Sequence, residues 1–283
     1  MTHGRLTTIL LALAASLLLA LGAAGCGDDD DDDGDNGGGG ADTTELDTIR
    51  PGTLTVGSDI PYPPFEQGRA PDYDGFDIEL INEIASRLEL DVQIKDTPFD
   101  TIFRDLAQGK FDVVISGSTI TDERERAVDF GDPYFLAEQS LLVQVDSDIQ
   151  AIDDLPGQTV GVQKGTTGEA YVKEEAPDAT VRSYGDLDDA FNALVAGQVD
   201  AVMFDLPGTQ EAARTKEGLE VRESYDTGEE FGIAFQEDAD ALREAVNGAL
   251  AEVKDDGTFA ELYTEWFKKD PPQEILTATH TPD

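Results

Sequence analysis

The chain has 283 residues and is strongly acidic, with 61 Asp and Glu residues against 19 Lys and Arg residues and a formal net charge of −42. This charge balance excludes a nucleic-acid-binding protein, which needs a basic surface. The histidines are His3 and His280, and the single cysteine is Cys26. The long middle of the chain therefore cannot supply Ser-His-Asp or Cys-His catalysis, a disulfide, or a His- or Cys-ligated zinc site. We expect no cofactor and no metal.

Residues 1–25 are typical of a secretory signal peptide. Arg5 precedes an apolar run over residues 9–21, and small residues follow directly before Cys26. We expect cleavage before Cys26 and lipidation of its side chain, with cleavage nearby and no lipid as the alternative. Residues 26–45 are rich in Asp and Gly and are predicted to be a disordered tether. The protein is therefore expected outside the cytoplasm, lipid-anchored to the outer face of the cell membrane or periplasmic.

The next part of the chain is predicted to alternate strands and helices in the order βαβαβ. Strands are expected over residues 53–57, 92–95 and 111–115, which are short runs with apolar and β-branched residues. Helices are expected over residues 75–88 and 98–108, where apolar residues recur at helical spacing and Gly109 follows. The prolines at positions 61, 63 and 64 predict an irregular loop after the first strand.

The same pattern begins again after Pro156. Strands are predicted over residues 159–162, 180–184 and 201–204, with helices over residues 169–175 and 187–196 between them. The segment from Gly109 to Val114 is echoed by the segment from Gly197 to Val202, with the same order of element types and little sequence identity. This repetition indicates two α/β lobes, each with small polar residues at the carboxyl edge of its sheet.

Two strands are predicted to connect the lobes. Residues 140–145 leave the first lobe, and residues 231–235 return to it before helices over residues 239–254 and 259–267. The first lobe is thus expected to comprise residues 46–139 and 231–270, the second residues 140–230, and residues 271–283 a loose tail. Two crossings form a hinge about which the lobes can close on a ligand.

The most informative stretch runs from Lys110 to Tyr134. Its strand ends in Ser116, Gly117 and Thr119, and Arg124 follows at the start of a helical turn. Ligands of open α/β sheets bind at the carboxyl ends of strands, and backbone amides beside a guanidinium form a receptor for a carboxylate. The alternative is that the charged residues 122–126 are only a solvated surface run.

The motifs GSTITDER (117–124) and VDFGDPY (128–134) resemble the family 3 extracellular solute-binding proteins, the receptors of polar amino-acid ABC transporters. The resemblance extends from about residue 53 to residue 267. It implies an α/β, two-lobed periplasmic-binding-protein-like (type II) fold with two crossing hinge strands.

The resemblance also implies the parts of an amino-acid site. Arg124 would hold the ligand carboxylate together with backbone amides near Thr119 and Thr167. Asp205 would hold the ammonium, with the Gly117 carbonyl as a second acceptor at the strand end that also carries Ser116. Asp205 could instead cap the helix that follows it.

Three aromatic residues and one acid would set the ligand's identity in such a receptor. Tyr62, Phe65 and Phe99 match positions that sandwich an aliphatic stem, and Phe65 could equally be a core aromatic. Asp59 matches a position that is acidic in receptors for basic amino acids. Lys164 would reverse this preference if it pointed inward. A basic amino acid is therefore expected, with a neutral polar one such as glutamine as the alternative.

The function that the resemblance implies is a monomeric extracellular receptor. It would bind a free polar L-amino acid between closing lobes and deliver it to a membrane-embedded ABC permease, and it would not be an enzyme. The alternative is a carboxylate-dependent enzyme on the same fold, dehydratase-like or lytic-transglycosylase-like, in which Glu66 or Asp77 would act as acid or base. We regard a sensor ectodomain as less well supported, since no membrane span or signalling domain follows.

Overall fold

The computed structural model describes residues 46–281. The predicted signal peptide, Cys26 and the tether lie outside the described residues, so the structure leaves these predictions untested. No helix in the described part is long and apolar enough to cross a membrane.

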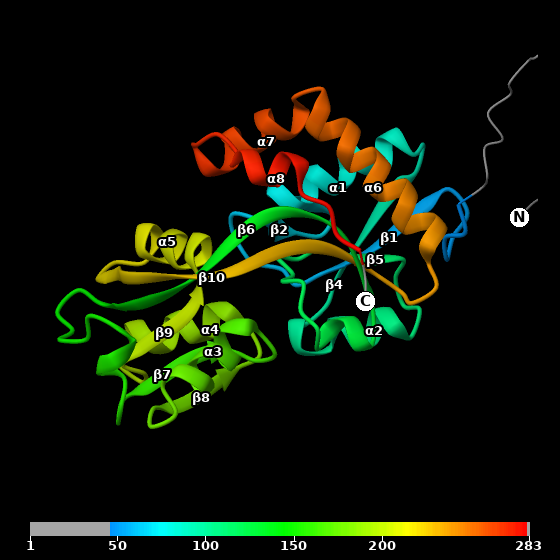
Figure 1. Cartoon of the computed structure of the whole chain (residues 1–283). Coiled ribbons are helices and arrows are strands. Elements are labelled where there is room, and N and C mark those ends of the chain that lie inside the picture. Colours follow the sequence, from blue (N-terminus) through cyan, green and yellow to red (C-terminus); the bar gives the residue numbers. More distant parts are fainter. Residues whose placement is uncertain (1–45, 282–283) are drawn as a thin grey trace, which may run out of the picture. The chain divides into compact units, whose positions relative to one another are not determined.

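Ten strands and eight α-helices make up the described part (Figure 1). The strands are β1 (Thr53–Ser58), β2 (Gln67–Arg69), β3 (Asp72–Asp74), β4 (Asp91–Asp96), β5 (Val113–Val114), β6 (Asp129–Gln144), β7 (Thr159–Gln163), β8 (Thr180–Tyr184), β9 (Ala201–Asp205) and β10 (Leu219–Phe235). The helices are α1 (Phe76–Arg87), α2 (Phe99–Ala107), α3 (Thr167–Glu175), α4 (Leu187–Val195), α5 (Leu206–Thr215), α6 (Asp240–Asp255), α7 (Thr258–Phe267) and α8 (Gln273–Thr277). Short 3-10 turns cover Arg124–Arg126 and Ile152–Asp154.

The long strands β6 and β10 form an antiparallel ribbon through the middle of the sheet, whose order is β4-β1-β5-β10-β6-β9-β7-β8. On one side of the ribbon β1 pairs in parallel with β4 and β5, and on the other side β7 pairs in parallel with β8 and β9. Figure 1 shows the resulting two lobes, with the ribbon between them. The fold is therefore α/β and two-lobed, and both lobes carry the predicted βαβαβ order.

The internal repeat has a counterpart in hydrogen bonding. Asp112, directly before β5, accepts a hydrogen bond from the Thr55 amide at 2.7 Å, and its own amide donates to the Thr55 carbonyl. Asp200, directly before β9, makes the same pair of bonds with Thr159, again at 2.7 Å from the amide. Each aspartate thus fixes the last strand of its lobe against the first, which is why the two segments look alike in the sequence.

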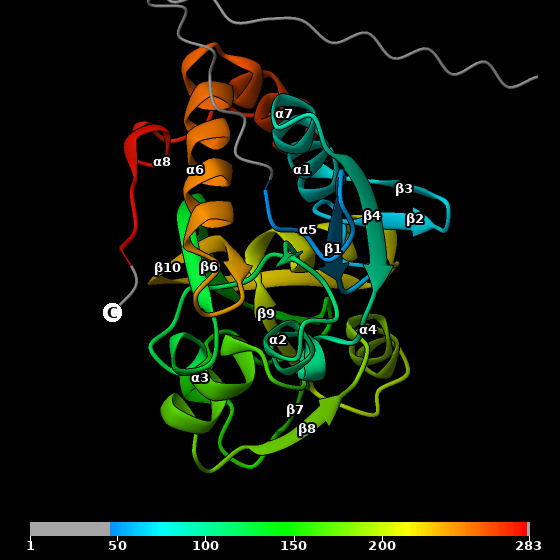
Figure 2. The ribbon, with the colours of Figure 1, turned by 90° about the vertical axis from the view of Figure 1, so that its right-hand side faces the viewer.

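The helices α1, α6 and α7 cover the outer part of the first lobe, whereas α2 faces the second lobe (Figure 2). As predicted, α7 packs onto this lobe: the Phe267 ring lies 4.9 Å from that of Phe135 and 5.3 Å from that of Phe65, and the Trp266 indole donates to Glu79.

One local prediction is wrong, and one element was not predicted. The segment after residue 270 is not loose, because it contains α8, buries Ile275, and joins the His280 amide to Asp132. The β2–β3 hairpin was not expected, since three-residue strands with exposed charged residues leave no apolar periodicity to detect.

Candidate functional site

A cavity between the lobes gathers nine of the ten residues predicted to bind a ligand. These are Asp59, Tyr62, Phe99, Ser116, Gly117, Thr119, Arg124, Thr167 and Asp205. Gln163, Thr166 and Phe204 complete its lining. Its volume is about 10 Å³, roughly that of one water molecule, so side chains of the two lobes meet directly. We call it the interlobe cavity, and a ligand larger than water can enter only when the lobes move apart.

Phe65 is the predicted site residue that the structure does not place in the interlobe cavity. It is fully buried and packs on Phe76, Phe135, Phe231 and Phe267. Phe65 therefore has the core role that the sequence left open. It does support the site indirectly, because its ring lies 4.9 Å from that of Tyr62.

Arg124 supplies the positive charge of the cavity. Its guanidinium donates to the carbonyl of Thr119 at 2.6 Å and, across the cavity, to the carbonyl of Gly165 at 3.3 Å. It also lies 5.1 Å from the centre of the Phe99 ring and 4.7 Å from that of Phe103, within the range of cation–π attraction. Burial lowers the pKa of Arg124 to about 10, so the group stays charged at neutral pH.

Asp205 supplies a negative charge from the second lobe. It is 6% exposed, and its carboxylate accepts hydrogen bonds from the Tyr62 hydroxyl at 2.9 Å and from the Gln139 amide at 2.6 Å. Although it precedes α5, its side chain makes no capping bond to that helix. Burial, with repulsion from Glu229, raises the pKa of Asp205 to about 7.

Asp59 lies at the carboxyl end of β1, where its carboxylate accepts a hydrogen bond from the Gln163 amide of the second lobe at 2.6 Å. Burial raises the pKa of Asp59 to about 7. Lys164 does not line the cavity: its ammonium pairs with Asp100 at 2.9 Å and is largely exposed. The only charged groups among the residues lining the cavity are therefore Asp59, Arg124 and Asp205.

Backbone groups at the two strand ends face the same space. Thr167 is the first residue of α3, and the amides at a helix start have no partner within the helix, so they suit an anion. Gly117 has a φ of +49°, and a Cβ there would lie 2.4 Å from the Tyr62 ring. Only glycine lets the strand end approach this aromatic ring so closely.

Glu229 of β10 is a functional residue that the sequence interpretation missed. Its carboxylate accepts from the hydroxyl of Thr119 at 2.8 Å and from that of Thr167 at 2.7 Å, so it connects the lobes at the hinge. It also accepts from the amide of Gln139 at 3.0 Å. Alternation along the returning strand could have placed Glu229 on one face, but nothing in the sequence indicates that this face meets Thr119.

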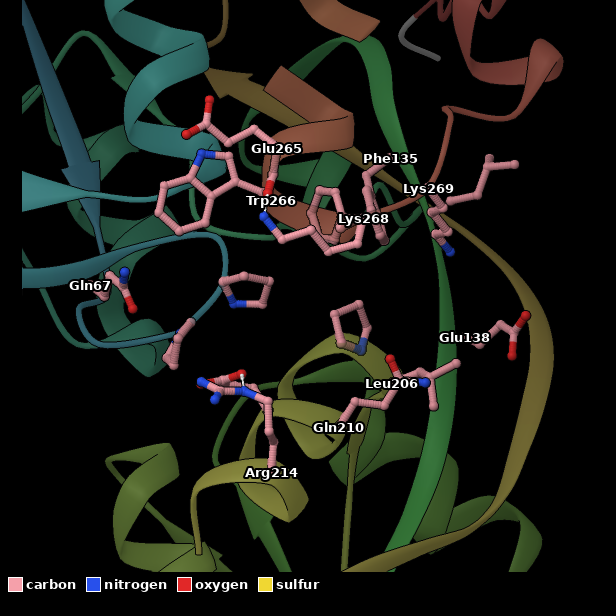
Figure 3. Close-up of a pocket in the computed structure, with 16 residues that line it drawn as sticks. Gln67, Phe135, Glu138, Leu206, Gln210, Arg214, Glu265, Trp266, Lys268 and Lys269 are labelled. Atoms are coloured by element: carbon pink, nitrogen blue, oxygen red, sulfur yellow. Dashed lines mark hydrogen bonds and ion pairs between the residues drawn. The ribbon is translucent and has the colours of Figure 1, made fainter. Parts of the chain in front are cut away.

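Figure 3 shows a second, larger hollow. Its volume is about 790 Å³, and it is lined by residues of the proline loop, β6, α5 and the end of α7. We call it the back groove. Successive residues of a strand face opposite sides, and Glu138 lines the groove whereas Gln139 contacts Asp205.

Sequence neighbours also separate at two other points, since Tyr62 and Asp205 line the cavity whereas Pro63 and Leu206 line the groove. The ribbon therefore lies between the two hollows. The groove's cations are exposed, and Arg214 is paired with Glu211. It therefore lacks the desolvated polar groups that the cavity has.

Known proteins share this fold and are similar to this chain in sequence. Residues 54–269 match the model for bacterial extracellular solute-binding proteins, family 3. The chain is 34% identical to the L-cystine-binding protein TcyJ of Escherichia coli over 223 residues, which is 77% of this chain and 84% of that protein. It is 35% identical to the ABC transporter glutamine-binding protein GlnH of Bacillus subtilis over 204 residues, 71% of this chain and 75% of that protein.

Solved structures give the same result. An ancestral arginine-binding protein bound to arginine is 40% identical, with a TM-score of 0.74 over 76% of this chain and 98% of that one. An ancestral arginine-binding protein bound to glutamine has a TM-score of 0.75 at 39% identity, over 78% of this chain and 100% of that one. This chain therefore belongs to the family 3 bacterial extracellular solute-binding proteins.

Proposed function

We propose that the protein is an extracellular receptor that binds a free polar α-amino acid between its lobes and delivers it to an ABC permease. The observation that carries this proposal is the pair Arg124 and Asp205. Both line one small cavity, and each is hydrogen-bonded only to neutral groups, with no ion pair recorded for either in the described part of the chain. A cation and an anion held in this way complement the carboxylate and ammonium of a zwitterion.

A ligand would replace the contacts that now close the cavity. Its carboxylate would bind the Arg124 guanidinium and the free amides at the start of α3, and its ammonium would bind Asp205. Tyr62 and Phe99 would flank the aliphatic stem. The relatives support this class of ligand, because they are described as binding cystine, glutamine or arginine.

We further propose a preference for basic amino acids. Asp59 lines the cavity, and Lys164, which could have opposed a cation there, points to Asp100 instead. Burial raises the pKa of Asp59 to about 7, so a buried cation beside it would be stabilised as the carboxyl loses its proton. Glutamine remains the second candidate. The side-chain amide of Gln163 already donates a hydrogen bond to Asp59, and the side-chain amide of a glutamine ligand would be the same kind of neutral donor.

An enzymatic role is not proposed. Glu66 and Asp77, the residues that would carry carboxylate chemistry, are 0% exposed and do not line the interlobe cavity.

The test is a thermal-shift screen of the mature protein against the twenty amino acids, ornithine and citrulline, followed by calorimetry of those that stabilise it. We expect arginine, lysine or ornithine to bind with a stoichiometry of one. Binding of an acidic amino acid alone would show that the ligand preference has been misassigned, and binding of none would contradict the receptor proposal.

We also propose that the protein is lipid-anchored through Cys26, as the sequence of residues 1–26 predicts. Mass spectrometry of the protein extracted from its membrane should find a diacylglyceryl modification on Cys26. An N-terminus elsewhere would remove the anchor from the proposal but leave the receptor function unaffected.

A further inference from the structure

Behind the interlobe cavity, two carboxyl groups are buried in the first lobe. Glu66 ends the proline loop and Asp77 lies in the first turn of α1, and both are 0% exposed. Their backbones are held together, because the Asp77 amide donates to the carbonyl of Phe65 at 2.9 Å. Both side chains extend to the same strand end, Ser116 and Gly117.

Each carboxyl group has one oxygen with partners and one without. Glu66 Oε1 accepts from the Ser116 hydroxyl at 2.5 Å. Asp77 Oδ2 accepts from the Gly117 amide and from the Tyr134 hydroxyl, both at 2.8 Å. Glu66 Oε2 and Asp77 Oδ1 are buried and have no hydrogen-bond partner in the described structure. Native proteins rarely leave two such atoms unsatisfied, so each calls for an explanation.

Among the described residues, no cation faces the pair. The titratable groups that face it are Asp59 after β1, Tyr62 of the proline loop and Tyr134 of β6, and none of these is a cation. A buried carboxylate without a cation is costly, and two in one place repel each other strongly.

We propose that Glu66 and Asp77 share one proton and that the resulting acid–carboxylate pair positions the Ser116–Gly117 peptide of the ligand site. The proton is carried by Glu66 Oε2 and is donated to Asp77 Oδ1, which supplies a partner for both unsatisfied oxygens at once. Asp77 is the charged member because it already accepts two hydrogen bonds, which favour the ionised form.

The electrostatics agree with this assignment. Burial, with repulsion from Asp77, raises the pKa of Glu66 well above its ordinary value. Burial also raises the pKa of Asp77, to about 7, although the Gly117 amide and the Tyr134 hydroxyl oppose the shift.

The pair acts on the site through one peptide. The Gly117 N–H is bound to Asp77, and in a trans peptide the carbonyl of the preceding residue points the opposite way. The Ser116 carbonyl is therefore directed away from Asp77. Ser116 lines the interlobe cavity, and its carbonyl accepts a hydrogen bond from the Ser118 hydroxyl at 3.4 Å, so the orientation of this peptide sets the position of the cavity wall at the strand end.

Ser116 carries the effect one step further, because its hydroxyl oxygen accepts from the Asp59 amide at 2.9 Å. The positioning half of this inference rests on the proposed amino-acid receptor function. The shared proton does not.

The shared proton is tested by urea unfolding of the wild type and Glu66→Gln across a series of pH values. The folded wild type keeps a proton that the unfolded chain releases near the ordinary Glu value of 4.5. Wild-type stability should therefore fall as pH rises above this value, by up to tenfold per pH unit in the unfolding equilibrium relative to Glu66→Gln. The control Glu174→Gln, on an exposed carboxylate, should run parallel to the wild type.

A difference between wild type and Glu66→Gln that stays constant with pH would show that no proton is shared, and would overturn the proposal. The positioning role is tested by calorimetry with arginine near pH 6. Glu66→Gln keeps a neutral donor and should bind within about threefold of the wild type. Glu66→Ala removes the partners of Ser116 Oγ and Asp77 Oδ1 and should bind about tenfold more weakly.

Equal arginine affinity of Glu66→Ala and Glu66→Gln would refute the positioning role. If Glu66→Ala does not fold, the amide proton shift of Gly117 by NMR decides the question, because the wild type should show a further step at high pH, where the shared proton is lost, whereas Glu66→Gln should show only the single titration of Asp77. A pH-dependent stability difference without binding of any amino acid would uphold the shared proton and reject the receptor function.

Discussion

The interlobe cavity and the back groove lie on opposite faces of the β6–β10 ribbon, and their charged side chains differ in burial and in pairing. In the groove, which has a volume of about 790 Å³, Arg214 is exposed and pairs with the nearby Glu211. In the cavity, which has a volume of about 10 Å³, Arg124 and Asp205 are hydrogen-bonded only to neutral groups. Arg214 of the groove is therefore neutralised by a neighbouring carboxylate, whereas Arg124 and Asp205 of the cavity are hydrogen-bonded without forming an ion pair with a protein group.

This difference shows why volume is a poor guide to the ligand site of a hinged protein. A closed site is small because its walls meet, whereas a groove behind the hinge is open in the same conformation. A better guide is an ionisable group whose pKa is shifted by burial: the pKa of Arg124 is lowered to about 10, and that of Asp205 is raised to about 7. Groups desolvated in this way interact strongly with a ligand of opposite charge.

The strongest test replaces one arginine on each face of the ribbon by alanine, in two separate variants. Arg124→Ala should weaken arginine binding more than a hundredfold, because a buried charge left without its partner costs roughly 3–5 kcal/mol. The matched control Arg214→Ala removes an exposed guanidinium of the groove and should change affinity by less than about twofold. Isothermal calorimetry measures both, and equal losses would contradict the assignment of the cavity as the ligand site.

Asp205→Asn should have the next largest effect. The asparagine keeps the size of the side chain but removes the negative charge that faces the ligand ammonium, and a hydrogen bond to a charged group contributes about 1.5–3 kcal/mol. We expect the affinity for arginine and for glutamine to fall alike, by roughly tenfold to a hundredfold. Retention of wild-type affinity for both would show that the ammonium binds elsewhere.

The affinity of the wild type should also depend on pH. In the closed structure the pKa of Asp205 is raised to about 7, mainly by burial, and a bound ammonium would lower it. Binding then releases a proton at pH values below about 7, so affinity should fall as pH drops, by at most tenfold per unit.

The effect of Asp205 on the ligand-free stability has the opposite sign. A carboxyl whose folded pKa is raised from 3.8 to about 7 makes the folded protein less stable as pH rises through that window.

The pH dependence of affinity is measured by calorimetry with glutamine at several pH values, which isolates the effect of Asp205 from that of Asp59. Asp205→Asn should bind glutamine independently of pH, and a slope equal to that of the wild type would assign the proton to another group.

The sequence was informative where function and local pattern coincide. Ser116, Gly117, Thr119 and Arg124 follow one buried strand within nine residues, and Asp205 ends the strand that repeats it. A strand pattern and its polar end are local, so they are readable without knowing the tertiary structure. The βαβαβ repeat and the two crossing strands could be predicted for the same reason.

Contacts between distant segments could not be predicted from the sequence. Glu229 reaches Thr119 over 110 residues of sequence, and Gln163 reaches Asp59 over 104. Their roles depend on how the ribbon brings the lobes together, which no local pattern encodes. Phe65 was placed in the site because it is only three residues from Tyr62 in the sequence, but its side chain faces the core.

A smaller effect separates the candidate ligands. Asp59→Asn should weaken arginine binding by about tenfold, on the order of 1.4 kcal/mol, because the distal cation loses its carboxylate. Glutamine binding should change little, since asparagine still offers the Gln163 amide an acceptor. Competition between the two ligands, followed by calorimetry, measures the ratio. An equal loss for both would mean that Asp59 maintains the cavity wall and does not select the ligand.

The smallest effects come from a glutamine on each face of the ribbon. Gln163 is 4% exposed and its amide bridges the lobes to Asp59 at 2.6 Å, so Gln163→Ala should weaken closure and reduce arginine affinity by about three- to tenfold. Gln210 is exposed on α5 and lines the groove, so Gln210→Ala should leave affinity within about twofold. Because Gln210 is exposed, its truncation removes no buried contact from the closed form. A larger loss from Gln210→Ala than from Gln163→Ala would show that the groove, rather than the cavity, limits lobe closure.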